Sequence, residues 1–255
     1  MGIETPICKL CLQSQATQAN SHVFPRFLIN SIRLTKTGKN KLFKKDRQNK
    51  GDQSTNVQDG PKENFIFCPK CEIYFSRIED KVARFFYKPL IEKRDLNQLI
   101  SLVNSRGFEY YTDAKIDYQT MKVFFYTLFF RSFLSKDGAL IDIHSSPEDE
   151  ETLRIILQSE VPFKDMPTYV LFCKDIVNPT GNIIYGSYIF NRSYLLFINE
   201  FIVLQNFDID DMKTIKSPGM VCNYNDTEFK IALLSKHQWE ITLATLRTLS
   251  IRASK

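Results

Sequence analysis

The spacing of apolar residues predicts three helices. In the segment EIYFSRIEDKVARFFYKPL, apolar residues recur at intervals of three and four, which predicts an amphipathic helix that ends before Pro89. The segment YQTMKVFFYTLFFRSFLS is apolar on nearly every side, so we expect a buried central helix. Ser146 and Pro147, followed by acidic residues, are typical of a helix start, and this helix should run to about Ser159.

Other segments have the composition of strands. TYVLFCKDI, NIIYGSYIF and YLLFINEFIVLQNF are rich in β-branched and aromatic residues and are separated by turn signals. We expect these segments to form an antiparallel sheet and ENFIF to form a short strand. Two more helices are predicted, one over residues 96–105 and one from Asp226 as N-cap to Arg252. The fold class is therefore α+β.

A polar, basic segment interrupts this pattern near the N-terminus. Residues 33–62 hold nine Lys/Arg against three Asp, while the whole chain has a net charge of +5. The remaining residues therefore sum to about −1, so the basic excess belongs to this one segment. It is poor in apolar residues, and we expect a long loop. We place a domain boundary after the next helix, which divides the chain into residues 1–92 and 93–255.

Composition restricts the class of protein. Hydrophobic residues make up 43% and charged residues 25% of the 255 residues, as in an average globular protein. No segment approaches the roughly 20 apolar residues of a membrane-spanning helix, and the N-terminus has no signal-peptide pattern. We therefore expect a folded protein that stays in the cytoplasm.

Four of the six cysteines indicate a metal site. Cys8 and Cys11 form one Cys-x-x-Cys pair, and Cys68 and Cys71 form another. Two such pairs supply the four thiolates of a tetrahedral structural zinc ion. The alternative is four reduced cysteines that bind nothing. The other two, Cys173 and Cys222, lie in strand-like surroundings and are expected in the core.

The order CKLC, SHVFPRFL and then CPKCE at the start of a helix resembles the zinc-containing HNH, or His-Me finger, endonucleases. The string QDGPKENFIFCPKCEIYFSRIE also resembles a group of uncharacterised bacterial proteins with an aromatic helix that ends in Trp/Phe-Arg, here Phe130-Arg131. The HNH resemblance covers residues 1–90. It implies a zinc-bound treble-clef or ββα module followed by a mixed helix and antiparallel-sheet domain.

The resemblance also implies roles for single residues. His22 matches the His that activates the attacking water, and Ser21 stands where the family usually has a metal-binding Asp, Glu or His. Glu72 follows the last cysteine, where the family has a metal-binding His, and it would hold Mg²⁺ or Mn²⁺. Asn64 is the nearest match to the Asn that orients the catalytic His, and Asp59 is a spare carboxylate. The alternative is a module retained for its shape, in which His22 packs locally.

The basic segment suggests contacts with nucleic acid, more often DNA than RNA. Lysine and arginine side chains neutralise phosphates without reading sequence. The candidate contacts in this segment are Arg33, Lys36, Lys39, Lys41, Lys44, Lys45 and Arg47. The alternative is a solvated, lysine-rich loop that binds nothing in particular.

The second domain carries no recognisable catalytic motif, so we expect residues 93–255 to be a scaffold or a partner-binding surface. Arg131 and a group around Glu150, Glu151 and Arg154 are expected to form ion pairs. The other two histidines, His144 and His237, show no metal-ligand spacing, so we expect them to be structural.

Three functions are therefore expected. The first is a metal-dependent HNH-like nuclease that cleaves DNA in a bacterial defence or mobile-element system, a context that only the resemblance implies. The alternative is a non-catalytic zinc module that binds nucleic acid or a protein partner. A toxin-like RNase on the same scaffold is a third expectation.

Overall fold

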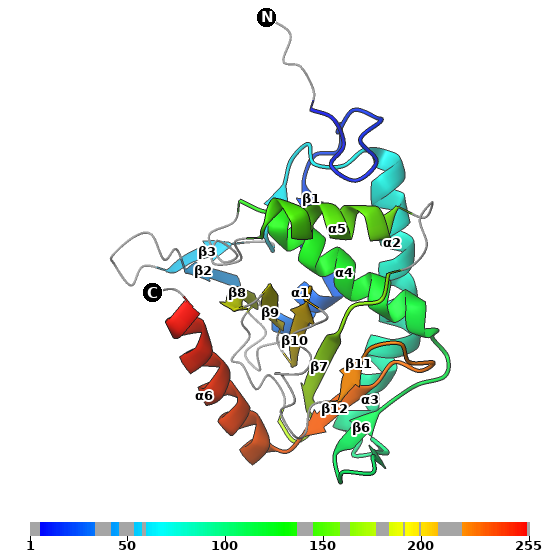
Figure 1. Cartoon of the computed structure of the whole chain (residues 1–255), viewed down its shortest axis with the longest axis vertical. Helices are drawn as coiled ribbons and strands as arrows, with labels where there is room; N and C mark the ends of the chain where they lie inside the picture. Colours follow the sequence, from blue (N-terminus) through cyan, green and yellow to red (C-terminus); the bar gives the residue numbers. More distant parts are fainter. Residues whose placement is uncertain are drawn as a thin grey trace, which may run out of the picture.

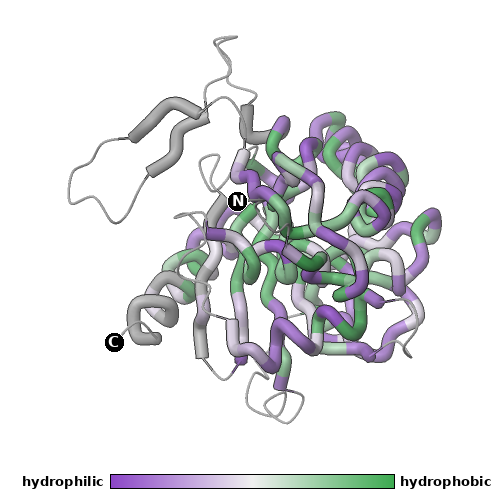
Figure 2. Tube along the Cα trace, turned by 90° about the horizontal axis from the view of Figure 1, so that it is seen from above, coloured by the Kyte–Doolittle hydropathy of each residue, from purple (hydrophilic) through white to green (hydrophobic). Residues whose placement is uncertain are grey.

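A mixed sheet lies between one helix on one side and a group of helices on the other (Figure 1). The computed structural model describes residues 6–33, 42–45, 54–57, 60–136, 145–158, 164–176, 184–190, 192–198, 200–208 and 221–253. Hydrophobic segments run through the interior of this part, and hydrophilic turns lie at its periphery (Figure 2). The α+β class predicted from the sequence is confirmed. None of the helices in the described ranges is long and apolar enough to cross a membrane.

The sheet has eight strands in the described part of the chain. From one edge they are β5 (Leu102–Val103), β6 (Glu109–Tyr111), β12 (Ile231–Leu234), β7 (Thr168–Cys173), β10 (Phe201–Asn206), β9 (Ser193–Ile198) and β8 (Ile184–Phe190), with β11 (Cys222–Asn223) also paired to β7. The pairs β8–β9, β9–β10 and β10–β7 are antiparallel, as predicted, whereas β12 runs parallel to β7.

Both faces of this sheet are covered. Every residue of β7, β9 and β10 is buried, which explains why their sequences show apolar runs rather than alternation. One face packs on a large cluster that includes Phe172 and Val203, together with the aromatic helix α4 (Tyr118–Leu134). The other face packs with Trp239 of helix α6 (Lys236–Ala253).

The two best-marked helices form as predicted. In α4, twelve consecutive residues from Met121 to Ser132 are buried, and the Asp117 side chain caps the helix by accepting the Thr120 N–H. Helix α5 (Pro147–Leu157) begins at its predicted cap, where Ser146 Oγ accepts the Asp149 N–H at 3.1 Å.

The helix that follows the second cysteine pair does not end before Pro89. Helix α2 (Pro69–Val82) continues through a π-helical turn, η1 (Ala83–Tyr87), into α3 (Lys88–Asp95). Proline lacks an N–H and clashes with the preceding turn, and the wider π turn lies just before it and accommodates it. Asn97, with φ of 54°, follows the end of α3, and the helix predicted over 96–105 is wrong because this region contains β5.

The last helix starts later than predicted. Asp226 is not its N-cap, because residues 231–234 form β12 beside β7. Helix α6 instead begins after Ser235, whose Oγ accepts the Gln238 N–H at 3.3 Å. The apolar run of β12 suits a buried strand as well as a helix, and only pairing with β7 decides between them.

The N-terminal part contains short elements. Strand β1 (Ser21–His22) pairs antiparallel with β4 (Lys62–Glu63), and helix α1 (Arg26–Arg33) follows β1. The segment expected to be a long loop contains the antiparallel pair β2 (Leu42–Lys45) and β3 (Ser54–Val57). ENFIF is not a strand, since β4 ends at Glu63.

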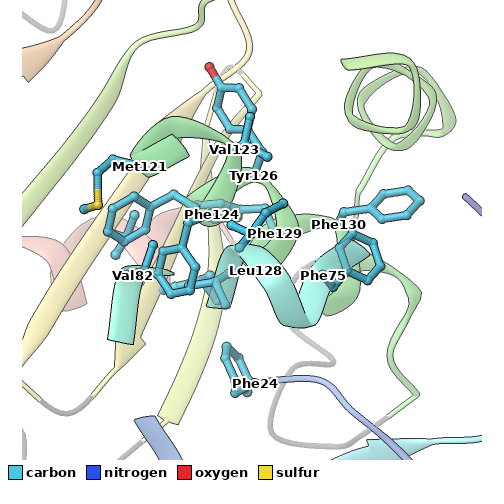
Figure 3. Close-up of a cluster of buried hydrophobic side chains, with 14 of the residues drawn as sticks. Phe24, Phe75, Val82, Met121, Val123, Phe124, Tyr126, Leu128, Phe129 and Phe130 are labelled. Atoms are coloured by element: carbon cyan, nitrogen blue, oxygen red, sulfur yellow. The ribbon is translucent and has the colours of Figure 1, made fainter. Parts of the chain in front are cut away.

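One hydrophobic cluster extends across the residue 92 boundary. Phe67, from the loop before α2, lies 5.0 Å from the ring of Phe75 in α2 and 6.0 Å from that of Phe130 in α4. Figure 3 shows Phe75 and Phe130 within this cluster. The N-terminal part is therefore packed directly on the central helix.

Candidate metal centre and adjoining polar network

Four cysteine sulfurs gather where the first loop meets the start of α2. The side chains of Cys8, Cys11, Cys68 and Cys71 present sulfurs within 4.8 Å of one another. The Cys11 and Cys68 sulfurs lie 3.9 Å apart, close to the roughly 3.8 Å that a tetrahedral zinc ion with 2.3 Å Zn–S bonds requires. The cluster could therefore hold a metal ion such as zinc.

Local backbone bonds shape both cysteine turns. In the first, the Leu12 N–H donates to the Cys8 carbonyl at 3.0 Å, and Leu12 adopts a φ of 54°. In the second, Cys68 is the N-cap of α2 and Pro69 occupies its first turn. The Lys9 N–H donates to the Ile66 carbonyl at 2.9 Å and joins the two turns.

The thiols influence one another's ionisation. The pKa of Cys8 is lowered to about 4, mainly because the Cys71 side chain hydrogen-bonds to its sulfur. The same contact raises the pKa of Cys71. Neighbouring thiolates repel each other, and a bound cation removes this conflict because it stabilises all four in the ionised form.

Strand β1 contacts helix α2 through Ser21. Ser21 is buried, and its Oγ donates to Oε1 of Glu72 at 2.5 Å. His22 is half-buried and follows Ser21 on β1. The structure therefore brings Ser21, the residue before His22, into contact with Glu72, 51 positions away.

Arg131 of helix α4 completes this network. The guanidinium lies 2.7 Å from Glu79 Oε1 and 3.8 Å from Glu72 Oε2. It also donates to the His22 carbonyl at 2.9 Å and lies 4.5 Å from the centre of the Phe75 ring. Burial raises the pKa of Glu79, Arg131 opposes this rise, and Glu72 adds to it.

These residues do not fit a catalytic Mg²⁺ or Mn²⁺ ion. Such ions need several oxygen ligands and keep bound water. Among the described residues, the four cysteines form the one group of three or more His, Cys, Asp or Glu side chains able to hold a metal. One oxygen of Glu72 is bonded to Ser21 and the other faces Arg131.

The remaining predicted catalytic residues have these positions. Asn64 is exposed, and its side-chain oxygen accepts the Asn20 N–H at 2.8 Å. Glu63 of β4, the neighbour of Asn64, also makes polar contacts: its Oε1 accepts the Ser135 hydroxyl at 2.9 Å and the Lys136 N–H at 2.5 Å, so the segment at the end of α4 contacts β4 as well as β1. Asp59 lies outside the described residues.

The side chains of the predicted nucleic-acid contacts lie outside the described part of the structure. Only the backbone is described for Arg33 in α1 and for Lys44 and Lys45 in β2. The other predicted contacts, Lys36, Lys39, Lys41 and Arg47, lie outside the described residues. His144 also lies outside them, and His237 is exposed on α6.

Sequence reasoning missed the partners of Arg131. Glu79 was not singled out, although Glu72, Phe75 and Glu79 share one helical face with buried apolar residues. An acidic residue on such a face is a signal for a buried cation. Arg154, in contrast, pairs with Glu151 within α5, as expected.

Comparison of the chain with known proteins finds no matching family, no matching curated protein and no matching solved structure.

Proposed function

We propose that Cys8, Cys11, Cys68 and Cys71 bind one structural zinc ion in a treble-clef-like module. The support is the four-sulfur cluster together with the β1–β4 pair and helix α2. When bound, zinc supplies a closed tetrahedral crosslink between the first loop and the helix. Residues 8–11 and 68–71 hold the ion and shape both ends of the module.

The function supported best is non-catalytic binding of nucleic acid by this zinc module. One observation carries this proposal: the Ser21 hydroxyl is bonded to Glu72 at 2.5 Å. In the resemblance to HNH endonucleases, these two positions hold the catalytic cation. Here they are bonded to each other, while residues 33–62 retain a charge excess of +6 for phosphate contacts.

The second candidate is the HNH-like nuclease, cleaving DNA as part of a defence system. The position of His22 on β1, next to the residue that contacts Glu72, favours it. In this function His22 would take a proton from the attacking water, and Asn64 would help to orient its ring.

A protein partner for residues 93–255 also stays a prediction. The edge strand β5 and the residues before it expose apolar side chains, with Ile100 78% exposed and Val103 61% exposed. An exposed edge strand is a common site for pairing with another chain.

A paired assay of binding and cleavage separates the two candidates. Zinc-loaded wild type and His22→Ala are incubated with supercoiled plasmid, with and without Mg²⁺ or Mn²⁺, and their DNA affinity is measured in parallel. We expect no nicking by either protein and equal, salt-sensitive binding by both.

Nicking by the wild type that falls by about 10² to 10⁴ in His22→Ala would replace the binding proposal with the nuclease. Zinc content and melting temperature of the variant are the controls for folding. Absence of nucleic-acid binding at low salt would reject the binding proposal itself.

A further inference from the structure

A buried arginine lies beside Glu72, the residue that the HNH resemblance assigns to a divalent cation. The Arg131 side chain is 5% exposed, and two carboxylates face it, Glu79 at 2.7 Å and Glu72 at 3.8 Å. Both carboxylates are also largely buried. Burial of an uncompensated charge is costly, so the three side chains stabilise one another. One guanidinium and two carboxylates together carry a formal charge of −1.

The network is also tied to the strand that carries His22. Arg131 donates to the His22 carbonyl at 2.9 Å, and Ser21 donates to Glu72 at 2.5 Å. A single guanidinium therefore holds β1, helix α2 and helix α4 together. A divalent ion on Glu72 would have to approach within a few ångströms of this fixed positive charge.

We propose that Arg131 is a resident cation that takes the place of a divalent ion between Glu72 and Glu79. This inference rests on the HNH-like assignment of β1 and α2 in the proposed function. The wild-type protein then does not bind Mn²⁺ between Glu72 and Glu79. A variant that lacks the arginine charge should bind it there. The ligand class is a hard divalent cation, held by the two carboxylates and water.

Arg131→Gln is the variant that tests the proposal. Glutamine keeps an N–H donor on a side chain that is two bonds shorter, and it removes the positive charge, which leaves two facing carboxylates. The probe is Mn²⁺ alone, titrated into zinc-loaded protein without nucleic acid, with free Mn²⁺ followed by electron paramagnetic resonance. Manganese does not displace zinc from thiolates, because zinc binds such sites more tightly.

We expect about one Mn²⁺ per chain in Arg131→Gln, bound at least about tenfold more tightly than by the wild type, because a like charge has been removed. Arg131→Lys keeps the charge and should bind no more Mn²⁺ than the wild type. The double variant R131Q/E72Q should lose the new site. Arg154→Gln, which breaks the exposed ion pair with Glu151, is the matched control and should create no site.

Two results would overturn the proposal. One is Mn²⁺ binding by the wild type that disappears in Glu72→Gln, a measurement that does not depend on Arg131→Gln folding. The other is a folded, zinc-loaded Arg131→Gln that binds no more Mn²⁺ than the wild type. Because no nucleic acid is present, failure here is distinct from failure of the proposed function, which the plasmid and affinity assays report.

Discussion

Replacement of Lys122 by methionine should strongly destabilise the protein. Lys122 lies in α4 and is fully buried. Its ammonium donates to the Thr168 hydroxyl and the Asn223 carbonyl, both at 2.8 Å, and to the Met166 carbonyl. It also pairs with Asp165 at 2.9 Å. One cation thus joins the central helix to β7, β11 and the loop before β7.

The size of the loss follows from the partners left behind. Methionine is of similar length but donates no hydrogen bond, so Asp165 keeps a largely buried charge without its cation. Breaking a buried pair in this way costs about 3–5 kcal/mol. The double variant K122M/D165N should recover part of this loss, because asparagine carries no charge. In the wild type the Tyr118 hydroxyl donates to Asp165 at 2.8 Å, and the asparagine oxygen can accept the same hydrogen bond.

The loss should also depend on pH. Burial lowers the pKa of Lys122 to about 8, against the opposing effect of Asp165. The ordinary pKa of a lysine in the unfolded chain is about 10.4, so between about pH 8 and this value the unfolded chain binds more protons than the folded chain. The free energy of unfolding therefore rises with pH in this window. From pH 7 to 9.5 this single group contributes a rise of about 2 kcal/mol, which Lys122→Met lacks.

Urea denaturation of both proteins at pH 7 and 9.5 measures this effect. Groups that titrate in this range but lie away from Lys122 and Asp165 cancel in the difference between the two proteins. The difference in unfolding free energy should be larger at pH 9.5 by about 2 kcal/mol. An equal difference at both pH values would refute the lowered pKa of Lys122, and a loss below about 1 kcal/mol at pH 7 would refute its role as a buried crosslink.

Three further predictions follow from the zinc cluster, the basic segment and the core. Cys68→Ser should reduce bound zinc from about one ion per chain to almost none and unfold the N-terminal module, whereas Cys173→Ser should keep the ion; elemental analysis and circular dichroism check both. Replacing Lys44, Lys45 and Arg47 by glutamate should weaken nucleic-acid affinity for all sequences and flatten its salt dependence, which titrations at several salt concentrations measure. Phe130→Ala, at a fully buried position, should lower the free energy of unfolding by about 3–5 kcal/mol, and an undiminished denaturation midpoint would contradict this.

The features predicted correctly from the sequence are those that depend on neighbouring residues. The cysteines of each pair are close in sequence and form their own turn, so their spacing indicated a four-thiol cluster that could hold a metal ion. The cap at Ser146 and the apolar character of α4 likewise depend on short-range chemistry. The continuous apolar runs of β7, β9 and β10 indicated strands of a sheet for the same reason.

Tertiary contacts decided the remaining features. Residues 231–234 form a strand because β7 lies parallel beside them, and periodicity over four residues cannot reveal a partner 60 positions away. Arg131 pairs with Glu72 and Glu79, which are distant in sequence, so no local pattern specified these contacts. The sequence by itself thus determined the cysteine pairs, the central helix and the strand segments of β7, β8, β9 and β10. Only the folded chain decided which buried charges meet, because their energies depend on distances and burial that arise when remote segments pack together.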